Sequence, residues 1–278
     1  MRIVVTGAEG GVGRALVDRA GDGHDVIGFG HGDLPVEQRE VVLAGIREAR
    51  PEVVVHLAAM TAVDACEEDP ERAFAVNATG TANVADAAAK AGSLLVYTST
   101  DYVFDGEKAE PYVESDPPSP ISAYGKSKLA GEDEVRARAP KHLVVRTGWL
   151  FGAGDDFFSR AVGKMAAGQR VGGLVDRTGT PTYVPHLADR LLALAGSDLR
   201  GLVHLSGPEP CRWFDLLARA RDAAAFSGGP VEQRSADLGL PAPRPRNSAL
   251  ASEILPVPGV APMPPIDEAL RVMLGTVR

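Results

Sequence analysis

The sequence predicts an α/β fold built on a doubly wound parallel sheet. Short runs of β-branched residues alternate with longer Ala-rich stretches through the first half of the chain, which is the pattern of repeated βαβ units. Several runs, such as Val53-Val54-Val55, are apolar throughout, as expected of strands that helices cover on both faces. A glycine-rich segment lies between the first run and the first helical stretch. Together these features predict a Rossmann-type sheet followed by a smaller C-terminal lobe.

Five strands and four helices are expected in the first half of the chain. The strands are the short runs rich in Val, Ile and Leu: Arg2–Thr6, His24–Phe29, Glu52–Leu57, Leu94–Ser99 and Leu143–Arg146. The helices are the longer stretches between them: Gly11–Ala20, Val36–Ala49, Pro70–Ala91 and Ala123–Ala139. The second helix starts beside Pro35, and proline is tolerated in a first turn because the N–H there has no partner. This order brings the carboxyl ends of the strands to one edge, where ligands bind in such sheets.

The regular alternation ends near residue 150. Beyond it we expect three helices, one strand and a final short helix: Phe157–Gly168, His186–Ala195, Trp213–Ala224, Gly201–Leu205 and Ile266–Leu274. The Gly/Pro-rich segment from Ser227 to Pro265 is expected to form extended loops, which in α/β enzymes commonly cover the strand ends and contact substrate. We therefore predict a Rossmann domain over residues 1–150 and a mainly substrate-binding lobe over residues 151–278.

Charge and cysteine content restrict the kinds of partner. The 278 residues carry a formal net charge of -8, which disfavours nucleic acid or an anionic membrane as a partner. The two cysteines, Cys66 and Cys211, are typical of free thiols in a reducing compartment. The start of the chain does not read as a secretory signal, and no apolar run reaches the roughly 18 residues of a membrane span. We expect a cytoplasmic protein whose partner is a small molecule.

The glycine-rich segment is the candidate site for a dinucleotide. Gly7, Gly10 and Gly13 follow the first strand at intervals of three residues and precede an amphipathic helix. Glycine allows a tight turn and close approach of the backbone, and the helix N-terminus offers free amides and a partial positive charge to a pyrophosphate. An ordinary turn is the alternative, but the position between strand and helix favours the cofactor site. The predicted contacts are Gly7, Gly10, Gly11, Val12 and Gly13.

The exit of the second strand predicts the type of dinucleotide. NAD-selective enzymes commonly carry an Asp or Glu there for the ribose 2′-hydroxyl, and the exit Phe29-Gly30-His31 has neither. The missing carboxylate removes repulsion towards a 2′-phosphate, so NADP (as NADPH) is favoured and NAD is the alternative. His31 or Arg14 could meet the phosphate, and a solvated surface role is the alternative for both. Asp33 and Leu34 are expected beside the adenine, and Ala58 and Ala59 where the third strand passes the cofactor.

Tyr124 and Lys128 form the candidate catalytic pair. They stand four residues apart at the start of a predicted helix, so both side chains project from one face. A phenol with an ordinary pKa of about 10 is a poor acid at neutral pH. An ammonium at roughly 5 Å is expected to lower that pKa by about 2 units. Chance occurrence of this spacing on a helix surface is the alternative.

Hydroxyl groups at the end of the fourth strand complete the candidate catalytic site. Thr100 stands at the predicted carboxyl edge, where it can hydrogen-bond a substrate carbonyl. The expected reaction is reduction of a ketone, in which hydride passes from the reduced nicotinamide to the carbonyl carbon and Tyr124 protonates the developing alkoxide. Thr100 orients that oxygen. Lys128 holds the cofactor ribose and tunes Tyr124, so Tyr124 and Lys128 are also expected cofactor contacts.

The chain resembles the dTDP-4-dehydrorhamnose reductase family of the extended short-chain dehydrogenase/reductase superfamily over nearly its whole length. The segments that carry the resemblance are Gly7–Gly13, Thr61–Asp64, Ser99–Gly106, Tyr124–Glu132, Arg146–Trp149, Asp176–Thr182 and Arg244–Leu250. Ser-Thr-Asp-Tyr-Val-Phe-Asp-Gly followed by Tyr-Gly-x-x-Lys-Leu-x-Gly-Glu is a highly specific combination. The resemblance implies NAD(P)H-dependent reduction of the 4-keto group of a dTDP-4-keto-6-deoxy sugar in dTDP-rhamnose biosynthesis. It also implies that Thr100, Tyr124 and Lys128 are the catalytic triad.

The resemblance further implies a set of substrate contacts. The residues expected to line the sugar or nicotinamide site are Thr61, Val63, Asp101, Tyr102 and Trp149, with core packing as the alternative for the tryptophan. Arg244 and Arg246 are the candidates for the nucleotide diphosphate, with exposed loop charges as the alternative. Dehydratases of the superfamily carry Thr-Asp-Glu where this chain has Thr100, Asp101 and Tyr102. Because the eliminating glutamate is missing, reduction without loss of water is expected.

Two other functions compete with this interpretation. One is a non-catalytic NADP-binding subunit that resembles the regulatory subunit of methionine adenosyltransferase. The other is a 4-ketoreductase for a different dTDP-deoxysugar of secondary metabolism. The intact triad favours an enzyme over the regulatory subunit. No carboxylate cluster in the sequence can be assigned to a metal, and a homodimer is left open.

Overall fold

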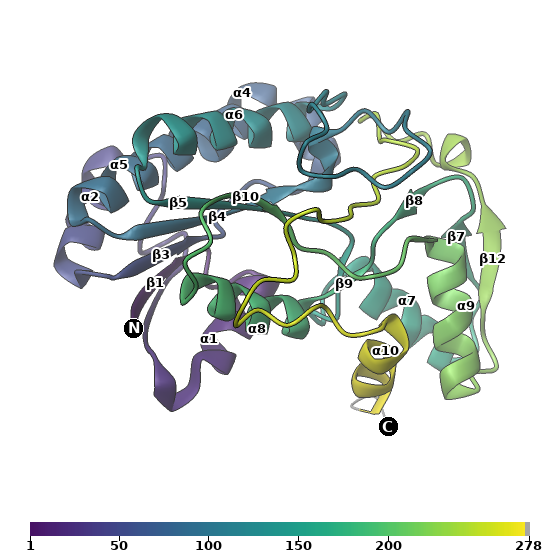
Figure 1. The fold of residues 1–278 in the computed structure, drawn as a ribbon. Coiled ribbons are helices and arrows are strands. Elements are labelled where there is room, and N and C mark those ends of the chain that lie inside the picture. The colour runs from purple at the N-terminus through teal and green to yellow at the C-terminus, as the bar shows by residue number, and fades with distance from the viewer. Residues whose placement is uncertain (276–278) are drawn as a thin grey trace.

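A six-stranded parallel sheet lies at the centre of the molecule, and the computed structural model describes residues 1–275 (Figure 1). The strand order is β10-β5-β4-β3-β1-β2, and every neighbouring pair is parallel. The strands are β1 (Arg2–Thr6), β2 (Asp25–Phe29), β3 (Val53–His56), β4 (Leu94–Thr100), β5 (His142–Thr147) and β10 (Gly201–His204). The order reverses between β1 and β3, which is the place where open α/β sheets bind ligands. The fold class predicted from the sequence is confirmed.

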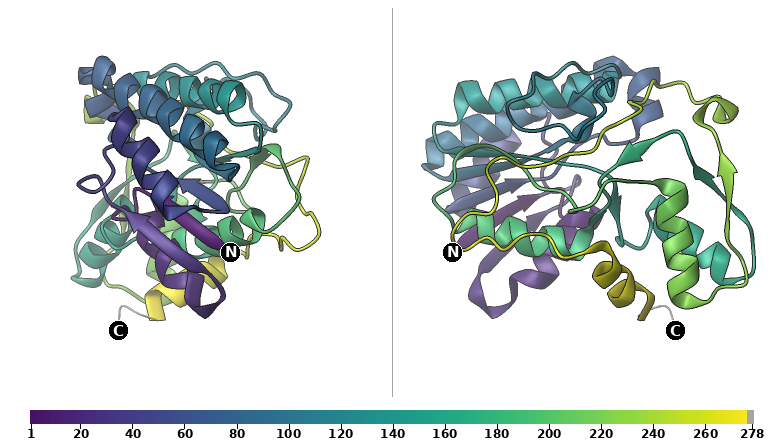
Figure 2. Two further views of the ribbon diagram at one scale, coloured as in Figure 1. Left: turned by 90° about the vertical axis from the view of Figure 1, so that its left-hand side faces the viewer. Right: turned by 45° about the vertical axis from the view of Figure 1, so that its right-hand side comes forward.

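Helices cover both faces of this sheet, as Figures 1 and 2 show. One face carries α2 (Arg39–Ala49), α5 (Thr81–Ala91) and α6 (Ala123–Arg138). The other face carries α1 (Gly11–Ala20) and α8 (Val184–Ala195), which pack against each other. The result is a three-layer arrangement with one apolar core on each side of the sheet.

The alternation of side chains along each strand explains the two cores. Ile3 and Val5 point into the core that α1 and α8 close, whereas Val4 points into the core that α2 and α5 close. All three side chains are fully buried. A strand with a core on both sides has no solvent face, so it appears in the sequence as a continuous apolar run.

The C-terminal lobe stands beside the carboxyl ends of the strands. Its helices are α7 (Phe157–Ala166), α9 (Trp213–Ala224) and α10 (Ile266–Gly275), which share a separate apolar core. Three two-stranded sheets accompany them: β6 (Leu150–Phe151) with β9 (Thr182–Tyr183), β8 (Thr178–Gly179) with β11 (Cys211–Arg212), and β7 (Val171–Leu174) with β12 (Pro230–Gln233). Single 3-10 turns occupy Gly21–Gly23, Asp101–Val103 and Ser235–Leu238. The segment before α10 runs across the front of the molecule in Figure 1.

Most of the predicted elements are present, and two helices differ. The second helix begins at Arg39 and not at Val36, because Val36 is buried and its carbonyl accepts a hydrogen bond from Asn83 Nδ2 at 2.9 Å. The stretch expected as one helix from Pro70 to Ala91 is divided into α4 (Pro70–Phe74), a π-helical segment (Ala75–Gly80) and α5. The short helix α3 (Val63–Glu68) had not been expected at all.

Two elements of the second half belong to the sheet layers. Strand β10 pairs with β5 at the edge of the sheet, and α8 packs on α1 beneath it. The Rossmann layers therefore draw residues from both sides of position 150. The division into a dinucleotide-binding part (residues 1–150) and a mainly substrate-binding part (residues 151–278) stays a prediction about function. In the structure, the chain passes between the sheet layers and the C-terminal lobe more than once.

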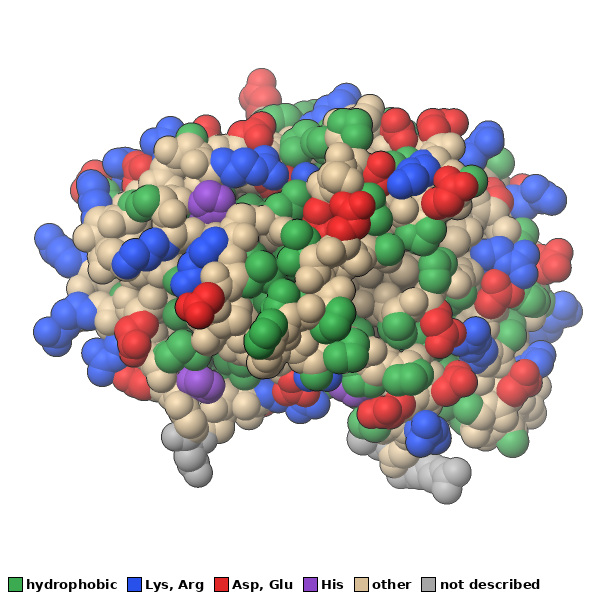
Figure 3. All heavy atoms as spheres, in the orientation of Figure 1, with side chains coloured by type: hydrophobic (Ala, Val, Ile, Leu, Met, Phe, Trp, Pro, Cys, Tyr) green, Lys and Arg blue, Asp and Glu red, His purple; other side chains and the backbone are tan. Residues whose placement is uncertain are grey.

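The surface carries charges of both signs. Figure 3 shows acidic and basic side chains interspersed over one face, with hydrophobic side chains between them. Within residues 1–275, no helix is both long enough and apolar enough to cross a membrane.

Candidate active site

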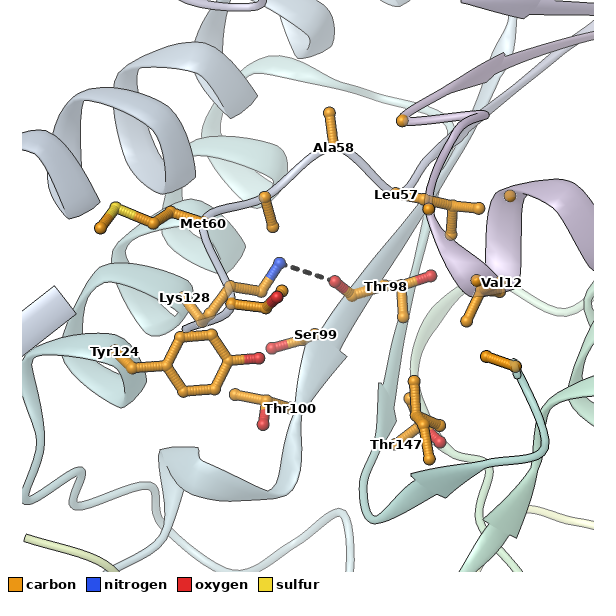
Figure 4. Close-up of a pocket in the computed structure, with 18 of the residues that line it drawn as sticks. Val12, Leu57, Ala58, Met60, Thr98, Ser99, Thr100, Tyr124, Lys128 and Thr147 are labelled. Carbon is orange, nitrogen blue, oxygen red and sulfur yellow. Dashed lines mark hydrogen bonds between the residues drawn. The ribbon is translucent and has the colours of Figure 1, made fainter. Parts of the chain in front are cut away.

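A cavity of about 880 Å³ lies at the carboxyl ends of the strands. Its walls come from the loops after β1, β2, β3 and β4, from the start of α6, and from the neighbouring part of the lobe. Figure 4 shows the catalytic candidates on one side of this cavity and Val12 and Leu57 on the other. The glycine loop and the Tyr124 hydroxyl thus border the same space, as the proposed chemistry requires.

The glycine loop forms a cradle that side chains would fill. A Cβ atom at Gly13 would lie 2.3 Å from the carbonyl oxygen of Gly7, and one at Gly7 would lie 2.7 Å from the amide nitrogen of Ala58. Gly7 also has a φ of 69°, which favours glycine. The loop leads into the N-terminus of α1, where free amides favour an anion. These observations fit the pyrophosphate of a dinucleotide, and Gly7, Gly10, Gly11, Val12 and Gly13 all line the cavity.

The loop after β3 forms the next part of the wall, where Ala58, Ala59 and Thr61 line the cavity. Asn77 fixes this loop from behind. Its Oδ1 accepts a hydrogen bond from the backbone amide of Met60 at 2.8 Å, and its Nδ2 donates to the carbonyl of Met60 at 3.0 Å and to Ser127 Oγ at 2.9 Å. Asn77 lies in the π-helical segment, and such segments are frequent at functional sites. Asn77, in the segment that interrupts the expected long helix, therefore links the loop that lines the cavity to α6.

Helix α6 presents Tyr124 and Lys128 to the cavity. Ser122 caps the helix by accepting a hydrogen bond from the Gly125 amide at 3.1 Å. Lys128 Nζ donates to the carbonyl oxygen of Thr98 at 2.8 Å and lies 4.2 Å from the ring centroid of Tyr97. Figure 4 shows the Tyr124 hydroxyl and the Lys128 amine on the same side of the helix, facing β4.

Burial controls the protonation of both groups. It lowers the pKa of Lys128 to about 7, and the nearby Glu132 carboxylate opposes that change. Burial raises the pKa of Tyr124 above its ordinary value, while a hydrogen bond with Thr100 acts in the opposite direction. The pKa of Tyr124 is therefore raised in this structure and not lowered as was expected from a neighbouring ammonium, because burial of the phenol outweighs the hydrogen bond that favours its anion.

Thr100 and Asp101 continue the polar group at the end of β4. Thr100 Oγ1 donates a hydrogen bond to Asp101 Oδ1 at 3.0 Å. Asp101 is 3% exposed, and its Oδ2 atom has no hydrogen-bond partner. Burial raises the pKa of Asp101 to about 7, although hydrogen bonds from Ser248 and Thr100 oppose that rise. A carboxyl group that is partly neutral at physiological pH can donate as well as accept a hydrogen bond.

Asp101→Asn is expected to change how stability depends on pH. The folded pKa of about 7 exceeds the ordinary value of 3.8, so the folded state binds more protons between these values. The free energy of unfolding of the wild type therefore falls as pH rises through this window, whereas asparagine does not titrate. The stability difference, variant minus wild type, should grow by up to about 1.4 kcal/mol per pH unit between about pH 4 and 7, as measured by urea unfolding.

Asp105→Asn is the matched control for this measurement. The hydroxyl of Tyr112 lowers the pKa of Asp105, so both its folded and its unfolded forms are ionised between about pH 5 and 7. The difference for this variant should be flat over that range. A flat difference for Asp101→Asn as well would contradict the assignment of a raised pKa to Asp101.

An aromatic stack forms the wall on the side of the lobe. The rings of Trp149 and Trp213 are stacked with centroids 4.4 Å apart and an angle of 6° between their planes, and both residues line the cavity. Trp149 Nε1 donates to Ser248 Oγ at 3.0 Å. A Cβ at Gly179 would lie 2.0 Å from the Trp149 ring, so glycine is needed behind it. Trp149 therefore lines the cavity, and its contact with the sugar or the nicotinamide stays a prediction.

The remaining expected contacts fall into two groups. Thr61, Val63, Asp101, Tyr102, His31 and Leu34 line the cavity together with the residues above. Asp33 lies outside it and accepts a hydrogen bond from the Gly30 amide at 3.3 Å. Arg244 is engaged with Asp64 through two hydrogen bonds of 2.9 and 2.7 Å, and neither Arg244 nor Arg246 lines the cavity. The assignment of both arginines to a diphosphate stays a prediction.

Several residues of the cavity wall were not anticipated from the sequence. They include Glu9, Met60, Ser99, Thr147 and Trp213. Trp213 begins a helix of the lobe, so its position opposite Trp149 depends on how the lobe packs and no local pattern reveals it. Among residues 1–275, no group of three or more His, Cys, Asp or Glu side chains is arranged to hold a metal ion.

Comparisons with known proteins place the chain in a family. The family described as "RmlD substrate binding domain" matches residues 1–278. A dTDP-4-dehydrorhamnose reductase of Sinorhizobium fredii is 36% identical over 262 residues, which cover 90% of this chain and 88% of that protein. The chain belongs to the dTDP-4-dehydrorhamnose reductase family.

Other members of the dTDP-4-dehydrorhamnose reductase family extend the comparison. A Streptomyces antibioticus protein named "Probable dTDP-4,6-dihydroxy-2-methyloxan-3-one 4-ketoreductase" is 36% identical and covers 98% of this chain and 94% of its own length. The crystal structure of the Bacillus anthracis dTDP-4-dehydrorhamnose reductase in complex with NADP superimposes with a TM-score of 0.94 at 32% identity and covers 99% of both chains. The family resemblance noted in the sequence is thus confirmed.

Proposed function

We propose that this protein is an NAD(P)H-dependent oxidoreductase that reduces the 4-keto group of a dTDP-4-keto-6-deoxy sugar. The observation that carries the proposal is the meeting of Thr100, Tyr124 and Lys128 in one cavity with the glycine cradle. Full-length relatives named for this reaction support it, and so does the NADP complex of the Bacillus anthracis protein. The reaction belongs to nucleotide-sugar biosynthesis, with NADPH as the favoured cofactor and NADH as the alternative.

The cofactor supplies a hydride to the carbonyl carbon when it is bound. Tyr124 donates its proton to the oxygen that becomes an alkoxide, and the hydrogen bond with Thr100 holds the phenol in place. Thr100 also orients the substrate oxygen towards Tyr124. Lys128, fixed by the carbonyl of Thr98, holds the cofactor ribose. The raised pKa of Tyr124 keeps the phenol protonated but also makes it a weaker acid, so its proton passes only to a strong base such as the developing alkoxide.

The sugar is proposed to lie between β4 and the aromatic stack. Asp101 and Tyr102 would contact its polar groups, while Trp149 offers a flat apolar face to the less polar side of a deoxysugar. Thr61 and Val63 close the cavity from the β3 side. Tyr102 stands where superfamily dehydratases carry a glutamate, so this site has no side chain there to eliminate water.

The test is a substrate panel. Purified protein is expected to oxidise NADPH when it is given dTDP-4-keto-6-deoxy sugars, monitored by loss of reduced nicotinamide absorbance. The panel includes the dTDP-sugar named for the Streptomyces antibioticus relative, because a deoxysugar of secondary metabolism is the second candidate substrate. UDP-keto sugars serve as controls for the nucleotide. If dinucleotide binds tightly and no keto sugar is consumed, the proposal fails in favour of a non-catalytic NADP-binding regulatory subunit.

The setting of the enzyme is part of the same proposal. A cytoplasmic location suits the two cysteines, Cys66 and Cys211, which are both buried and unpaired in the structure. We also propose that the first 150 residues mainly bind the dinucleotide and the rest mainly bind the sugar nucleotide. A homodimer is the assembly to be tested, by light scattering of the purified protein.

A further inference from the structure

A carboxylate from the glycine loop occupies the exit of the second strand. Gly30 directly follows β2, and a Cβ atom built on it would lie 2.4 Å from Glu9 Cδ and 2.5 and 2.7 Å from the two carboxylate oxygens. The Glu9 carboxylate therefore fills the space that a side chain at position 30 would need. Glu9 and Gly30 both line the large cavity.

This place in a Rossmann-type fold contacts the adenosine ribose. An Asp or Glu at the end of the second strand normally accepts hydrogen bonds from the ribose hydroxyls of NAD, and it repels the 2′-phosphate of NADP. The strand itself carries no such residue here. Glu9 brings the same chemical group to the same place from a different loop, which inspection of the strand alone does not reveal.

The Glu9 carboxylate is free to act on a ligand. Within residues 1–275, neither of its oxygens has a hydrogen bond or an ion pair with the protein. The neighbouring Arg14 guanidinium donates to the backbone carbonyl of Glu9 and pairs with Asp155 at 3.5 Å, so it does not neutralise the carboxylate. Glu37, Asp101, Asp155 and Asp156 also contribute carboxylates to the cavity wall, and His31, Arg72 and Lys128 are basic residues of the same wall.

We propose that Glu9 sets the choice between NADH and NADPH in this protein. Its carboxylate accepts hydrogen bonds from the ribose hydroxyls of NADH and opposes the 2′-phosphate of NADPH. The protein thereby accepts NADH although its second strand lacks the usual acidic residue. Its preference for NADPH is smaller than the missing carboxylate at the end of that strand would predict. The inference rests on the proposed binding of a nicotinamide dinucleotide and is independent of which sugar is reduced.

Dissociation constants provide the test, because they do not require turnover. NADH and NADPH are titrated into the protein and binding is followed by nicotinamide fluorescence. Glu9→Gln keeps the size of the side chain and removes its charge. The ratio of the NADH to the NADPH dissociation constant is expected to rise about tenfold in this variant, through weaker NADH binding and tighter NADPH binding. Asp18→Asn, an exposed change of the same kind on the outer side of α1, should leave the ratio unchanged.

A rescue variant separates this role from a general effect on the loop. The φ of Gly30 lies outside the left-handed region, so the backbone there accepts other residues. The double variant Glu9→Ala/Gly30→Asp moves the carboxylate back to the strand and should restore the wild-type ratio, which Glu9→Ala alone should not. An unchanged ratio in Glu9→Gln with normal binding overturns this inference alone. Failure of the wild type to bind either dinucleotide overturns it together with the proposed function.

Discussion

Replacing Tyr124 with phenylalanine is expected to lower kcat about 1,000-fold and to leave the dissociation constant of NADPH within about twofold of the wild-type value. The change removes one oxygen atom and keeps the ring, so the cavity wall and its edge-to-face contact with Tyr102 at 5.9 Å persist. The variant lacks the hydroxyl that the hydrogen bond with Thr100 holds in place. No group at that position can then donate a proton to the developing alkoxide. Steady-state kinetics with a dTDP-4-keto-6-deoxy sugar measure the first effect, and fluorescence titration with NADPH measures the second.

Tyr97→Phe is the matched control for that experiment. Tyr97 is also a buried phenol, but its hydroxyl donates to the carbonyl of Lys128 at 3.3 Å, interacts with the Thr81 side chain, and does not line the cavity. The ring that lies against Lys128 remains in this variant. Its kcat should stay within about fivefold of the wild-type value, since a single neutral hydrogen bond is worth about 1 kcal/mol. Wild-type turnover in Tyr124→Phe would remove Tyr124 from the mechanism.

The strands and the fold class were accessible from the sequence because the apolar pattern of each strand is local. A strand with helices on both faces is apolar throughout, so β3 is recognisable from Val53 to Val55 without any tertiary information. The helix starts were less accessible. Arg39 and not Val36 begins α2 because Asn83, which is distant in the sequence, binds the carbonyl of Val36. The π-helical segment likewise contains Asn77, whose side chain contacts the loop after β3, and no spacing of apolar residues predicts such a contact.

The residues of the candidate site likewise fall into those that local motifs predict and those that only the tertiary structure reveals. Gly7, Gly13, Thr100, Tyr124 and Lys128 belong to short motifs whose chemistry depends on spacing along one element, and the structure brings them to one cavity. Trp213 and Glu9 reach that cavity through the packing of a separate lobe and through the path of a loop. Neither follows from a local pattern.

The protonation states show a further limit of sequence reasoning. The distance between two side chains on a helix predicts a charge interaction only if both groups keep their charge. Burial lowers the pKa of Lys128 to about 7, so its effect on Tyr124 cannot be inferred from the four-residue spacing. The burial that decides this outcome includes contacts with β4, where Lys128 meets the Thr98 carbonyl and the Tyr97 ring, and such contacts do not follow from the sequence of α6.

Arg146→Met is expected to lower the free energy of unfolding by about 3–5 kcal/mol. Arg146 is 1% exposed and Glu132 is fully buried. Arg146 Nε and Nη2 each donate to the Glu132 carboxylate at 2.8 Å, and Ser99 Oγ donates to it at 2.6 Å. Removing the guanidinium leaves a buried carboxylate that the half-exposed Arg136 alone can pair. Urea unfolding at neutral pH measures the loss.

The double variant Glu132→Leu/Arg146→Met tests whether the pair stabilises the fold or only avoids an unpaired charge. An apolar pair of similar volume requires no desolvation of ions, so the double variant should be more stable than Arg146→Met and regain most of the loss. The Ser99 hydroxyl then loses its acceptor, which costs about 1 kcal/mol. A double variant less stable than Arg146→Met would contradict this account, because it would mean that the carboxylate stabilises the fold without its arginine.

The same ion pair also predicts a dependence on acid. Burial alone would raise the pKa of Glu132, but the hydrogen bonds and charges of Arg146, Ser99 and Arg136 outweigh it and lower the pKa below its ordinary value of 4.5. The unfolded state therefore binds the proton first as pH falls, so the stability that Glu132 contributes is complete above about pH 5 and is lost as pH falls through its folded pKa. The stability advantage of the wild type over Glu132→Gln should shrink over that acidic range. Because Glu132 joins α6 to β4 and β5, that loss loosens the helix that carries Tyr124 and Lys128, and activity should fall over the same range.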